Sequence, residues 1–523
     1  MNRFFENKWA LSLTAGLLLG LSFPPVNLSF LSFPAFILLF MLSEKCESYK
    51  QTAYYSYAGF LIWNLTTTYW LMMASIGAGV AAILANSVLM TIPLCLAQFF
   101  NRKYKSPILI ALLQASAWVG YEFLHHNWDL AWPWLAIGNG WSNQVSLIQF
   151  ISVTGHLGIS FWVVFTSALA VQAIRLRTRM LAISTIASLL LLPATSLIYF
   201  ASTNPVEADS DPVHVAVIQP NHDSYEDYGG MSGPNEVLDS LFSITNKIRT
   251  DETELIVWPE NAIDQAIRID SYISNRIADS ANGWNANLIV GTGLTVVYED
   301  DQSLPVTYRT SRNGANYNIF NSALYSDSGG NLTYYNKANL VPIVERTPFL
   351  DFFNTVDIFE WIDWGAIPNY GKGITPDMLD AESFSTSGLV CYDSVFPTWV
   401  REFVHDGADF ITIITNDGWW GNSSGHHQHF AYARLRAIEF DRWVVRSANN
   451  GTSGIIRPDG TVEQKTDYWV RTGFNSAIPR KSNTTVYARF GDWLSYLCLL
   501  LVLGGWLYGR FILKPTISNE SQS

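Results

Sequence analysis

The stretch STNPVEADSDPVHVAVIQP, residues 202–220, divides the chain into two parts of different composition. Long apolar runs precede it, and short apolar runs alternate with polar segments after it. Of the 523 residues, 49% are hydrophobic and only 15% are charged, whereas about a quarter are charged in average soluble domains. We therefore predict a membrane domain over residues 1–205, an extracytoplasmic domain over 206–489, and a membrane helix with a cytoplasmic tail over 490–523.

Eight apolar runs are candidates for membrane-spanning helices, and most approach the roughly 20 residues that a bilayer core requires. A soluble helical core would need charged helix faces, and these runs have almost no charged residues. The runs are 9–23, 28–42, 54–73, 80–100, 107–123, 157–174, 181–200 and 493–513.

The basic residues between the runs predict the orientation of the chain. They occur before the first run, after the second, fourth and sixth, and at the end of the eighth (Arg3, Lys8, Lys45, Lys50, Arg102, Lys103, Lys105, Arg175, Arg177, Arg179, Arg510 and Lys514). Connections 24–27, 74–79 and 125–156 contain no Lys or Arg. Since cytoplasmic loops are rich in Lys and Arg, we expect both termini in the cytoplasm and residues 206–489 on the far side.

The far-side part has the pattern of an α/β layered domain. Strand-like runs such as VHVAVIQ (213–219), ELIVW (254–258), SGLVCY (387–392) and FITIITN (410–416) alternate with segments of helical spacing. This alternation is typical of α/β folds. The net charge of −12 argues against a nucleic-acid partner.

Cys391 is the only cysteine of this domain, because Cys46, Cys95 and Cys498 fall in the predicted membrane part. A buried cysteine often acts as a small hydrophobic residue, and that reading is the ordinary alternative here. An unpaired thiol is a liability in an oxidising compartment, however, so a chemical role also has to be considered.

Two charged residues follow strand-like runs in the same domain. Glu260 lies just past ELIVW, where ligands bind in α/β sheets, although a helix cap or a surface acid would look the same. Lys337 follows LTYYN, and Glu345 lies eight positions further on. Taken alone, Lys337 would be read as a solvated surface charge.

In chain order, Glu260, Lys337 and Cys391 resemble the Glu-Lys-Cys triad of the nitrilase superfamily. Several spans, then such a domain, then one last span resemble the apolipoprotein N-acyltransferase family. The resemblance rests on AWPWLAIGN (131–139), WPENA (258–262), TYYNKANLVPIVERTP (333–348), CYDSVFP (391–397), TNDGWWGNSSGHHQHF (415–430) and RLRAIEFDRWVVRSANNGTSGIIRPDG (434–460). It implies a protein of the bacterial inner membrane whose far-side domain is an α-β-β-α sandwich on the periplasmic side.

The resemblance also implies a reaction without a cofactor or metal. Glu260 would take the proton of Cys391, which would attack a phospholipid ester and form a thioester. Lys337 would stabilise the oxyanion. The α-amine of a diacylglyceryl-modified apolipoprotein would then accept the acyl chain, in a ping-pong scheme.

Supporting roles follow from the same resemblance. Glu345 corresponds to a second acid of the family. Tyr392 and Asp393 correspond to a Cys-Tyr-Glu pattern in which Asp here replaces Glu. The family tryptophan after the first strand has no counterpart in QPNHDSYEDYGG (219–230), where Tyr225 and Tyr228 are the only candidates to replace it.

Several alternatives stay open at the level of sequence. A membrane-tethered amidase or hydrolase would use water as second nucleophile, and a scaffold would use no chemistry at all. Residues 347–365 could form a lid or ordinary core, and residues 126–156 could lie at the membrane interface or pack on the domain. His426, His427 and His429 lack the companion ligands of a metal site.

Overall fold

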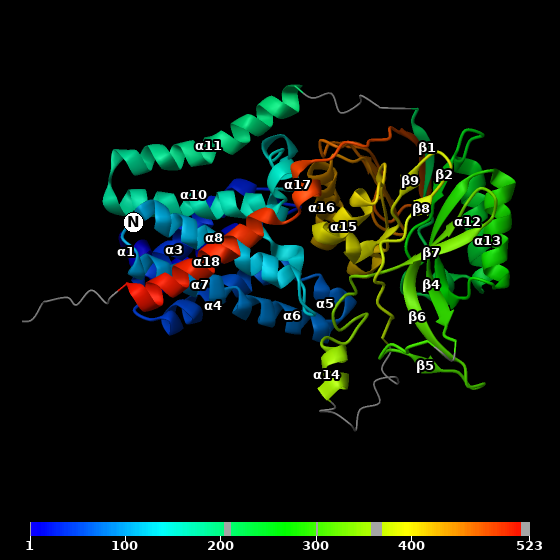
Figure 1. Ribbon diagram of the computed structural model, residues 1–523, viewed down its shortest axis with the longest axis horizontal. Helices are drawn as coiled ribbons and strands as arrows, with labels where there is room; N and C mark the ends of the chain where they lie inside the picture. The colour runs from blue at the N-terminus through cyan, green and yellow to red at the C-terminus, as the bar shows by residue number, and fades with distance from the viewer. Residues whose placement is uncertain (1, 203–210, 300–301, 357–368, 514–523) are drawn as a thin grey trace, which may run out of the picture.

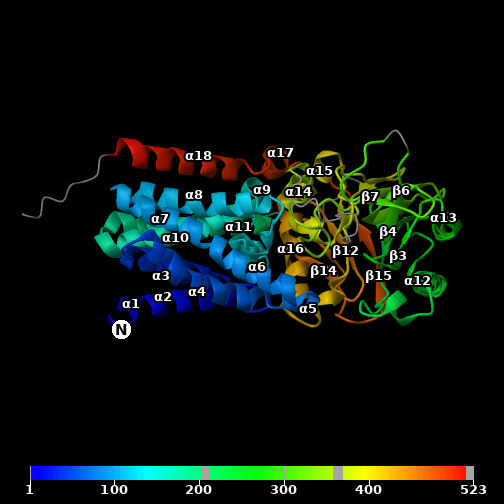
Figure 2. The same cartoon turned by 90° about the horizontal axis from the view of Figure 1, so that it is seen from below.

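The computed structural model describes residues 2–202, 211–299, 302–356 and 369–513. A bundle of long helices occupies one half of the molecule and a strand-rich sandwich the other, with α18 returning to the bundle (Figure 1). The helices of the bundle run side by side in both views (Figures 1 and 2). They are α2 (Lys8–Ser22), α3 (Ser32–Lys45), α4 (Tyr49–Thr68), α6 (Ile76–Leu89), α7 (Thr91–Lys103), α8 (Pro107–His126), α10 (Leu157–Leu176), α11 (Arg179–Ser202) and α18 (Trp493–Leu507).

Every predicted run is helical, but not every run meets the requirements of a membrane span. Within the described part of the chain, five stretches are long and apolar enough, namely 76–103, 107–126, 157–176, 179–202 and 493–512. Helices α2 and α3 have only 15 and 14 residues, and α4 carries many polar side chains. Five of the eight predicted spans are therefore long and apolar enough to cross a membrane. The helices of the other three runs, α2, α3 and α4, pack in the same bundle.

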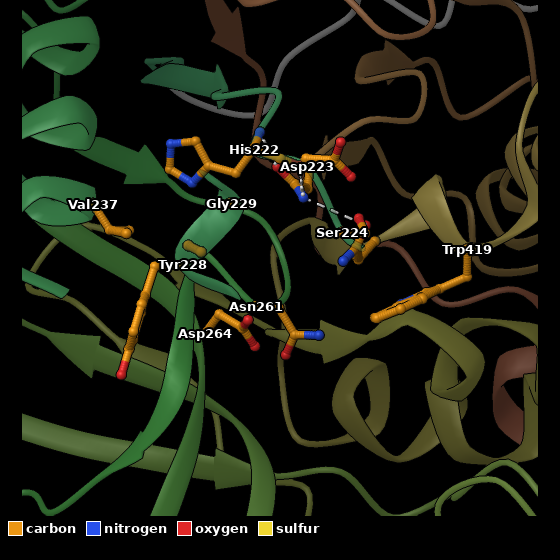
Figure 3. A pocket seen from close by; sticks show the side chains of 12 residues that line it. His222, Asp223, Ser224, Tyr228, Gly229, Val237, Asn261, Asp264 and Trp419 are labelled. Carbon is orange, nitrogen blue, oxygen red and sulfur yellow. Dashed lines mark hydrogen bonds between the residues drawn. The ribbon is translucent and has the colours of Figure 1, made fainter. Parts of the chain in front are cut away.

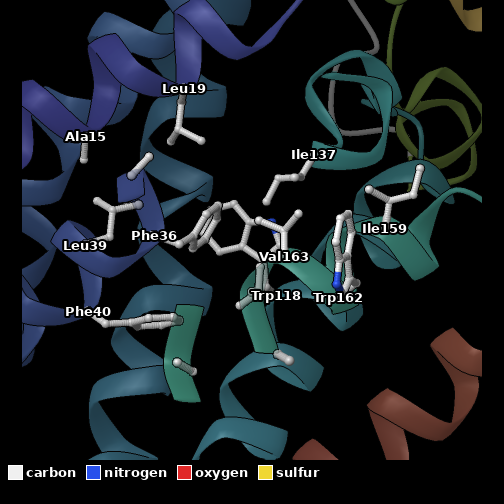
Figure 4. Close-up of a cluster of buried hydrophobic side chains, with 14 of the residues drawn as sticks. Ala15, Leu19, Phe36, Leu39, Phe40, Trp118, Ile137, Ile159, Trp162 and Val163 are labelled. Carbon is white, nitrogen blue, oxygen red and sulfur yellow. The ribbon is translucent and has the colours of Figure 1, made fainter. Parts of the chain in front are cut away.

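One apolar core joins the bundle. Phe36 of α3 packs against Trp118 of α8, with ring centroids 4.7 Å apart, and Phe40 of α3 and Trp162 of α10 belong to the same cluster (Figure 4). Helix α11 packs on α10 and otherwise exposes apolar side chains, as expected for a surface that faces lipid.

The connections without Lys or Arg face the sandwich. The Gln428 amide donates to the Pro24 carbonyl at 3.0 Å, and the Tyr432 hydroxyl donates to the Trp134 carbonyl at 3.0 Å. The short helix α5 (Leu71–Ala74) and the start of α6 also lie at this end of the bundle (Figure 2). The connections without Lys or Arg therefore lie together at the end of the bundle that contacts the sandwich.

The sandwich consists of two sheets. The first has the order β15-β1-β2-β4-β6-β5, with β3 beside β4 and β7 beside β6. The second has the order β10-β11-β12-β13-β14. The strands are β1 (Val213–Gln219), β2 (Leu255–Val257), β3 (Ile263–Ile267), β4 (Asn287–Val297), β5 (Arg309–Thr310), β6 (Asn316–Ser326), β7 (Leu332–Asn336), β10 (Leu389–Val390), β11 (Ile411–Thr415), β12 (Val444–Ala448), β13 (Gly454–Ile456), β14 (Val462–Lys465) and β15 (Thr472–Ile478), and a small pair is formed by β8 (Leu379–Asp380) and β9 (Ser385–Thr386).

Alternation along β1 shows how the layers stack. Val215 and Val217 pack in the core shared with the second sheet, while Ala216 and Ile218 pack against α12 (Pro234–Ile248) and α13 (Tyr272–Trp284). This is the period of two expected of a strand buried on both faces. Helices α15 (Pro397–His405) and α16 (Ser424–Phe440) pack on the second sheet. The predicted α-β-β-α sandwich is confirmed.

Candidate active site

The three candidate catalytic residues lie just beyond the ends of three strands. Glu260 follows β2, Lys337 directly follows β7, and Cys391 directly follows β10. The predicted strand over 387–392 is too long, because β10 ends at Val390. Cys391 has a φ of +48°, a left-handed conformation that a non-glycine residue rarely adopts, and it starts a 3₁₀ turn that runs to Val395.

A buried cluster of charges forms at these strand ends. The Lys337 ammonium lies 2.8 Å from Glu345 Oε1 and 3.5 Å from Glu260 Oε1. The Asn321 amide donates to Glu260 at 2.8 Å and to Glu345 at 3.1 Å. The backbone N–H of Asn416 donates to the other Glu260 oxygen at 2.9 Å. Both carboxylates are thus held in fixed positions around one lysine.

Burial decides the protonation of this cluster. It raises the pKa of Glu260, against the opposing effect of Lys337. It also raises the pKa of the Cys391 thiol well above its usual value, and the Glu260 charge adds to the effect. Burial would lower the pKa of Lys337, but Glu345 and Glu260 raise it well above its ordinary range. The arrangement therefore combines a fixed cation, a thiol that is protonated at rest, and a carboxylate with raised proton affinity.

A second network holds the backbone of the cysteine. The Cys391 carbonyl accepts from the Ser394 hydroxyl at 2.7 Å and lies 3.3 Å from His429 Nε2. His429 Nδ1 lies 2.9 Å from Asp417, whose other oxygen lies 2.6 Å from the Arg446 guanidinium. Both ring nitrogens of His429 are therefore engaged in contacts that hold the backbone at Cys391. Among the described residues, no group of three or more His, Cys, Asp or Glu side chains is placed to hold a metal ion.

The predicted supporting residues next to Cys391 point to different neighbours. Asp393 is fully buried and accepts from the Tyr335 hydroxyl and the Asn339 backbone N–H, both at 2.7 Å. Burial raises the pKa of Asp393 to about 6. The Tyr392 hydroxyl donates to the Ala131 carbonyl at 3.0 Å. Asp393 thus holds the segment after Lys337, and Tyr392 fastens the cysteine to the membrane part.

One cavity of about 640 Å³ brings the two halves of the molecule together. The sandwich contributes Glu260, Lys337, Glu345 and Cys391 to its wall. The membrane part contributes tryptophans and a row of small residues (Trp70, Leu71, Ala74, Ser75, Ala78, Gly79, Ala81, Ala82, Ala85, Asn86, Leu89, His125, Leu130, Ala131, Trp132 and Trp134). A ligand that reaches Cys391 here can therefore have both a polar and a long apolar part.

A much smaller cavity, of about 20 Å³, lies beside the Glu260 loop. Figure 3 shows Tyr228 and Trp419 on opposite sides of it, with Asn261 between them. The Tyr225 hydroxyl donates to the Trp419 carbonyl at 3.0 Å. Trp419 also lines the large cavity, whereas neither tyrosine does. Of these aromatic residues, Trp419 is the one placed to contact a ligand near the cluster.

Two further predictions are tested only in part. In the segment 347–365, residues 357–365 lie outside the described residues. Its described end forms α14 (Leu350–Val356), in which Leu350 is buried and Phe352 is exposed. The segment 126–156 packs on the sandwich rather than lying free, since Trp132 stacks near Tyr392.

Sequence reasoning missed Asn321, Asn416, Asp417 and Arg446. Asn416 and Asp417 lie in the quoted TNDGWWG motif directly after β11, and polar residues at such a strand end are a usable signal. Asn321 lies within the strand β6, where the local sequence NSALYS reads as an ordinary buried strand, and no such signal marks it.

Comparison with known proteins agrees with the division into a helical N-terminal part and a sandwich. Residues 15–169 match the apolipoprotein N-acyltransferase N-terminal domain, and residues 214–482 match the carbon-nitrogen hydrolase family. The apolipoprotein N-acyltransferase of Chlorobaculum tepidum is 29% identical over 95% of this chain and 96% of its own length. That of Rickettsia prowazekii is 27% identical over 94% and 96%. A solved CN-hydrolase superfamily protein from Xanthomonas campestris covers 51% of this chain and 91% of its own, at 17% identity and a TM-score of 0.37, a likeness too weak to carry an argument. The chain belongs to the carbon-nitrogen hydrolase family, and its N-terminal domain is that of the apolipoprotein N-acyltransferases.

Proposed function

We propose that this protein transfers a fatty acyl chain from a phospholipid to the α-amine of a diacylglyceryl-modified apolipoprotein, through a thioester on Cys391. The relatives named apolipoprotein N-acyltransferase support lipoprotein N-acylation. The observation that carries the proposal is the single cavity lined by Glu260, Lys337 and Cys391 at one end and by small apolar residues of α5 and α6 at the other.

In the first half-reaction, Glu260 takes the Sγ proton and the thiolate adds to an ester carbonyl of the phospholipid. A base is required because burial keeps the Cys391 thiol protonated, and the thiolate is the competent nucleophile. The oxyanion that forms is stabilised by Lys337. When the C–O bond breaks, Glu260 returns the proton to the leaving alkoxide, lysophospholipid departs, and the thioester remains.

In the second half-reaction, the free α-amine of the apolipoprotein adds to the thioester carbonyl. Glu260 takes a proton from the attacking nitrogen, and the C–S bond breaks to give an amide and the Cys391 thiolate. The proton returns from Glu260 to sulfur. Lys337 stays cationic throughout, because the neighbouring carboxylates raise its pKa. The scheme is ping-pong because lysophospholipid leaves, with the acyl chain held on Cys391, before the amine reacts.

The supporting residues have distinct proposed roles. Glu345, at 2.8 Å from the Lys337 ammonium, orients that side chain. Asp393 positions the segment after Lys337 through Asn339, and Tyr392 joins the cysteine loop to the membrane part.

We also infer a cellular arrangement from the distribution of charge. The connections without Lys or Arg lie at the sandwich end of the bundle, so the basic connections belong on the opposite, cytoplasmic side. The sandwich is then periplasmic, both termini are cytoplasmic, and the bilayer is the bacterial inner membrane. Residues 1–205, 206–489 and 490–523 remain our proposed division of the chain.

The test is the intact mass of the purified protein after incubation with phospholipid. We expect an increment of one acyl chain that hydroxylamine removes, present in the wild type and in Cys95→Ala and absent in Cys391→Ala. Cys95 is a matched control because it is a free cysteine of the bundle.

Addition of a diacylglyceryl peptide separates the remaining alternatives. Loss of the increment with formation of an N-acyl peptide supports the transferase. Release of free fatty acid with no N-acyl peptide would make the protein a hydrolase, and no increment on folded, lipid-exposed protein would reject the thioester altogether.

A further inference from the structure

Two consecutive residues of α16, Gln428 and His429, contact different parts of the molecule. Side chains of adjacent residues in a helix point about 100° apart. The Gln428 amide contacts the bundle, where it donates to the carbonyl oxygens of Pro24 and Thr67, both at 3.0 Å. His429 contacts the cysteine loop, with Nε2 at 3.3 Å from the Cys391 carbonyl oxygen. One helix therefore contacts both the bundle and the backbone of the proposed nucleophile.

Two tryptophans of the bundle share the oxygen of the Gln428 side chain. The indole N–H of Trp134 donates to it at 2.7 Å, and that of Trp70 at 3.2 Å. Trp70 follows α4, whereas Trp134 lies in a 3₁₀ turn (Pro133–Leu135), so segments far apart in the chain meet here. The two indole rings have centroids 5.0 Å apart, and both line the large cavity. Gln428 therefore holds part of the cavity wall.

The Gln428 side chain uses its whole hydrogen-bonding capacity. A glutamine amide has two N–H donors and one oxygen that can accept twice, and here two carbonyls and two indoles occupy these positions. The side chain is fully buried, so a shift of either half of the molecule would leave several buried polar groups without partners, which is costly. Fully paired buried networks of this kind specify one arrangement. Gln428 therefore fixes the bundle relative to α16.

A second residue on the same face of α16 contacts the same tryptophan. Tyr432 lies four residues after Gln428, about one helical turn further on, and its hydroxyl donates to the Trp134 carbonyl oxygen at 3.0 Å. The rings of Tyr432 and Trp134 also pack together, with centroids 5.2 Å apart. One face of α16 thus holds Trp134 both at its indole nitrogen and at its backbone.

We propose that Gln428 is a positioning residue that aligns the bundle wall of the large cavity with Cys391, so that a long-chain lipid ester held along this wall meets the thiol. Gln428 itself does not line the cavity and acts through Trp70, Trp134 and α16. A lipid that contacts both halves of the molecule depends on their alignment, whereas a small soluble ester depends on the sandwich alone. This inference rests on the proposed function and adds a residue to it.

The test compares two acyl donors on the full-length protein in detergent: a long-chain phosphatidylethanolamine, and p-nitrophenyl acetate, which acetylates a thiol and releases p-nitrophenol. Acylation is followed by intact mass, and the increment that remains in Cys391→Ala is subtracted. Gln428→Met nearly keeps the length of the side chain and removes its amide. We expect acylation by the phospholipid to slow about 10- to 100-fold and acylation by p-nitrophenyl acetate to change by less than about twofold, because small misplacements of a bound substrate have large effects on rate.

A milder variant tests the same alignment even if Gln428→Met does not fold. Tyr432→Phe keeps the ring and removes only the hydroxyl that donates to the Trp134 carbonyl oxygen. We expect the same selective loss with the phospholipid, of smaller size. Gln302→Met, at an exposed position of the sandwich, is the matched control and should change neither rate. A general loss of stability would slow both donors, so the ratio of the two rates is the readout.

Two results would overturn the proposal while leaving the thioester mechanism in place. An equal loss with both donors would mean that Gln428 supports the sandwich itself, and unchanged rates with both donors would mean that the alignment does not depend on this residue. The wild type tests the proposed function separately. If p-nitrophenyl acetate acylates Cys391 and the phospholipid does not, the phospholipid is not the acyl donor, and both proposals fail.

Discussion

The two ends of the large cavity differ in almost every physical property. At the sandwich end, Glu260, Lys337 and Glu345 are buried against one another and against amide donors. At the bundle end, the wall is made of alanines and aromatic rings without a charged group. A low-dielectric wall strengthens the electrostatic interactions at the opposite end. In the proposed reaction, the sandwich supplies the chemistry and the bundle supplies the space for the acyl chain of the substrate.

This division predicts how substitutions should behave. Changes at the sandwich end should slow acylation for every lipid, whatever its chain. Changes at the bundle end should depend on the length of the chain.

The largest effect is expected for Glu260→Gln. The amide keeps the size of the side chain but cannot take the thiol proton, and general bases contribute about 10²- to 10⁴-fold to rate. The initial rate of Cys391 acylation, followed by intact mass, should fall by that factor for long and short chains alike. Glu252→Gln, at an exposed position, is the matched control. An unchanged acylation rate in Glu260→Gln would mean that another group is the base.

The second largest effect is expected for Lys337→Met. The rate of Cys391 acylation should fall by about 10²- to 10³-fold, the usual effect of removing one oxyanion donor. It also leaves the buried Glu260 and the partly buried Glu345 without their cation, and breaking a buried pair costs about 3–5 kcal/mol. We therefore expect a lower midpoint of thermal unfolding as well as slower acylation. Lys372→Met, an exposed lysine, should change neither. A variant that loses stability but acylates at the normal rate would leave Lys337 with a structural role only.

The acylation rate should depend on pH through the protonation of Glu260. Burial raises the pKa of Glu260 above its ordinary value of 4.5. Below the raised pKa the base is already protonated, so the acylation rate should fall about tenfold per pH unit as pH decreases. The midpoint of this acid limb should lie above pH 4.5 and should be absent from the residual activity of Glu260→Gln. A limb that persists unchanged in that variant belongs to another group.

The sequence predicted the sandwich end better than the bundle end. The strand predicted over 213–219 coincides with β1, because a short, mostly apolar run between turn residues is typical of a buried strand. Glu260 and Lys337 follow strands of the first sheet and Cys391 follows a strand of the second, and residues just past strand ends are common ligand-binding positions in α/β folds.

Other features depend on contacts between distant segments. The stacking of Trp132 near Tyr392 depends on the packing of the two halves of the molecule, and the pairing of Asn321 with two carboxylates depends on the register of β6 with β4. No local pattern encodes either. The break between α6 and α7 at Met90 interrupts one continuous apolar run, and its sequence signal is Pro93 in the first turn of α7, because proline is tolerated at the start of a helix and not in its interior.

The smallest effect, and the one most specific to the bundle end, is expected for Ala82→Phe. Ala82 lines the large cavity, whereas Leu84, two residues on, is 43% exposed and does not. A phenyl ring at this wall removes volume that the far end of a long chain requires, and overpacking typically costs about 1–3 kcal/mol, or about five- to 150-fold in affinity. Acylation by a long-chain phospholipid should therefore slow by about tenfold, acylation by a short-chain phospholipid should hardly change, and Leu84→Phe should affect neither. A loss of equal size for both chain lengths in Ala82→Phe would mean that α6 also sets the geometry at Cys391, and the division of labour between the two ends would have to be abandoned.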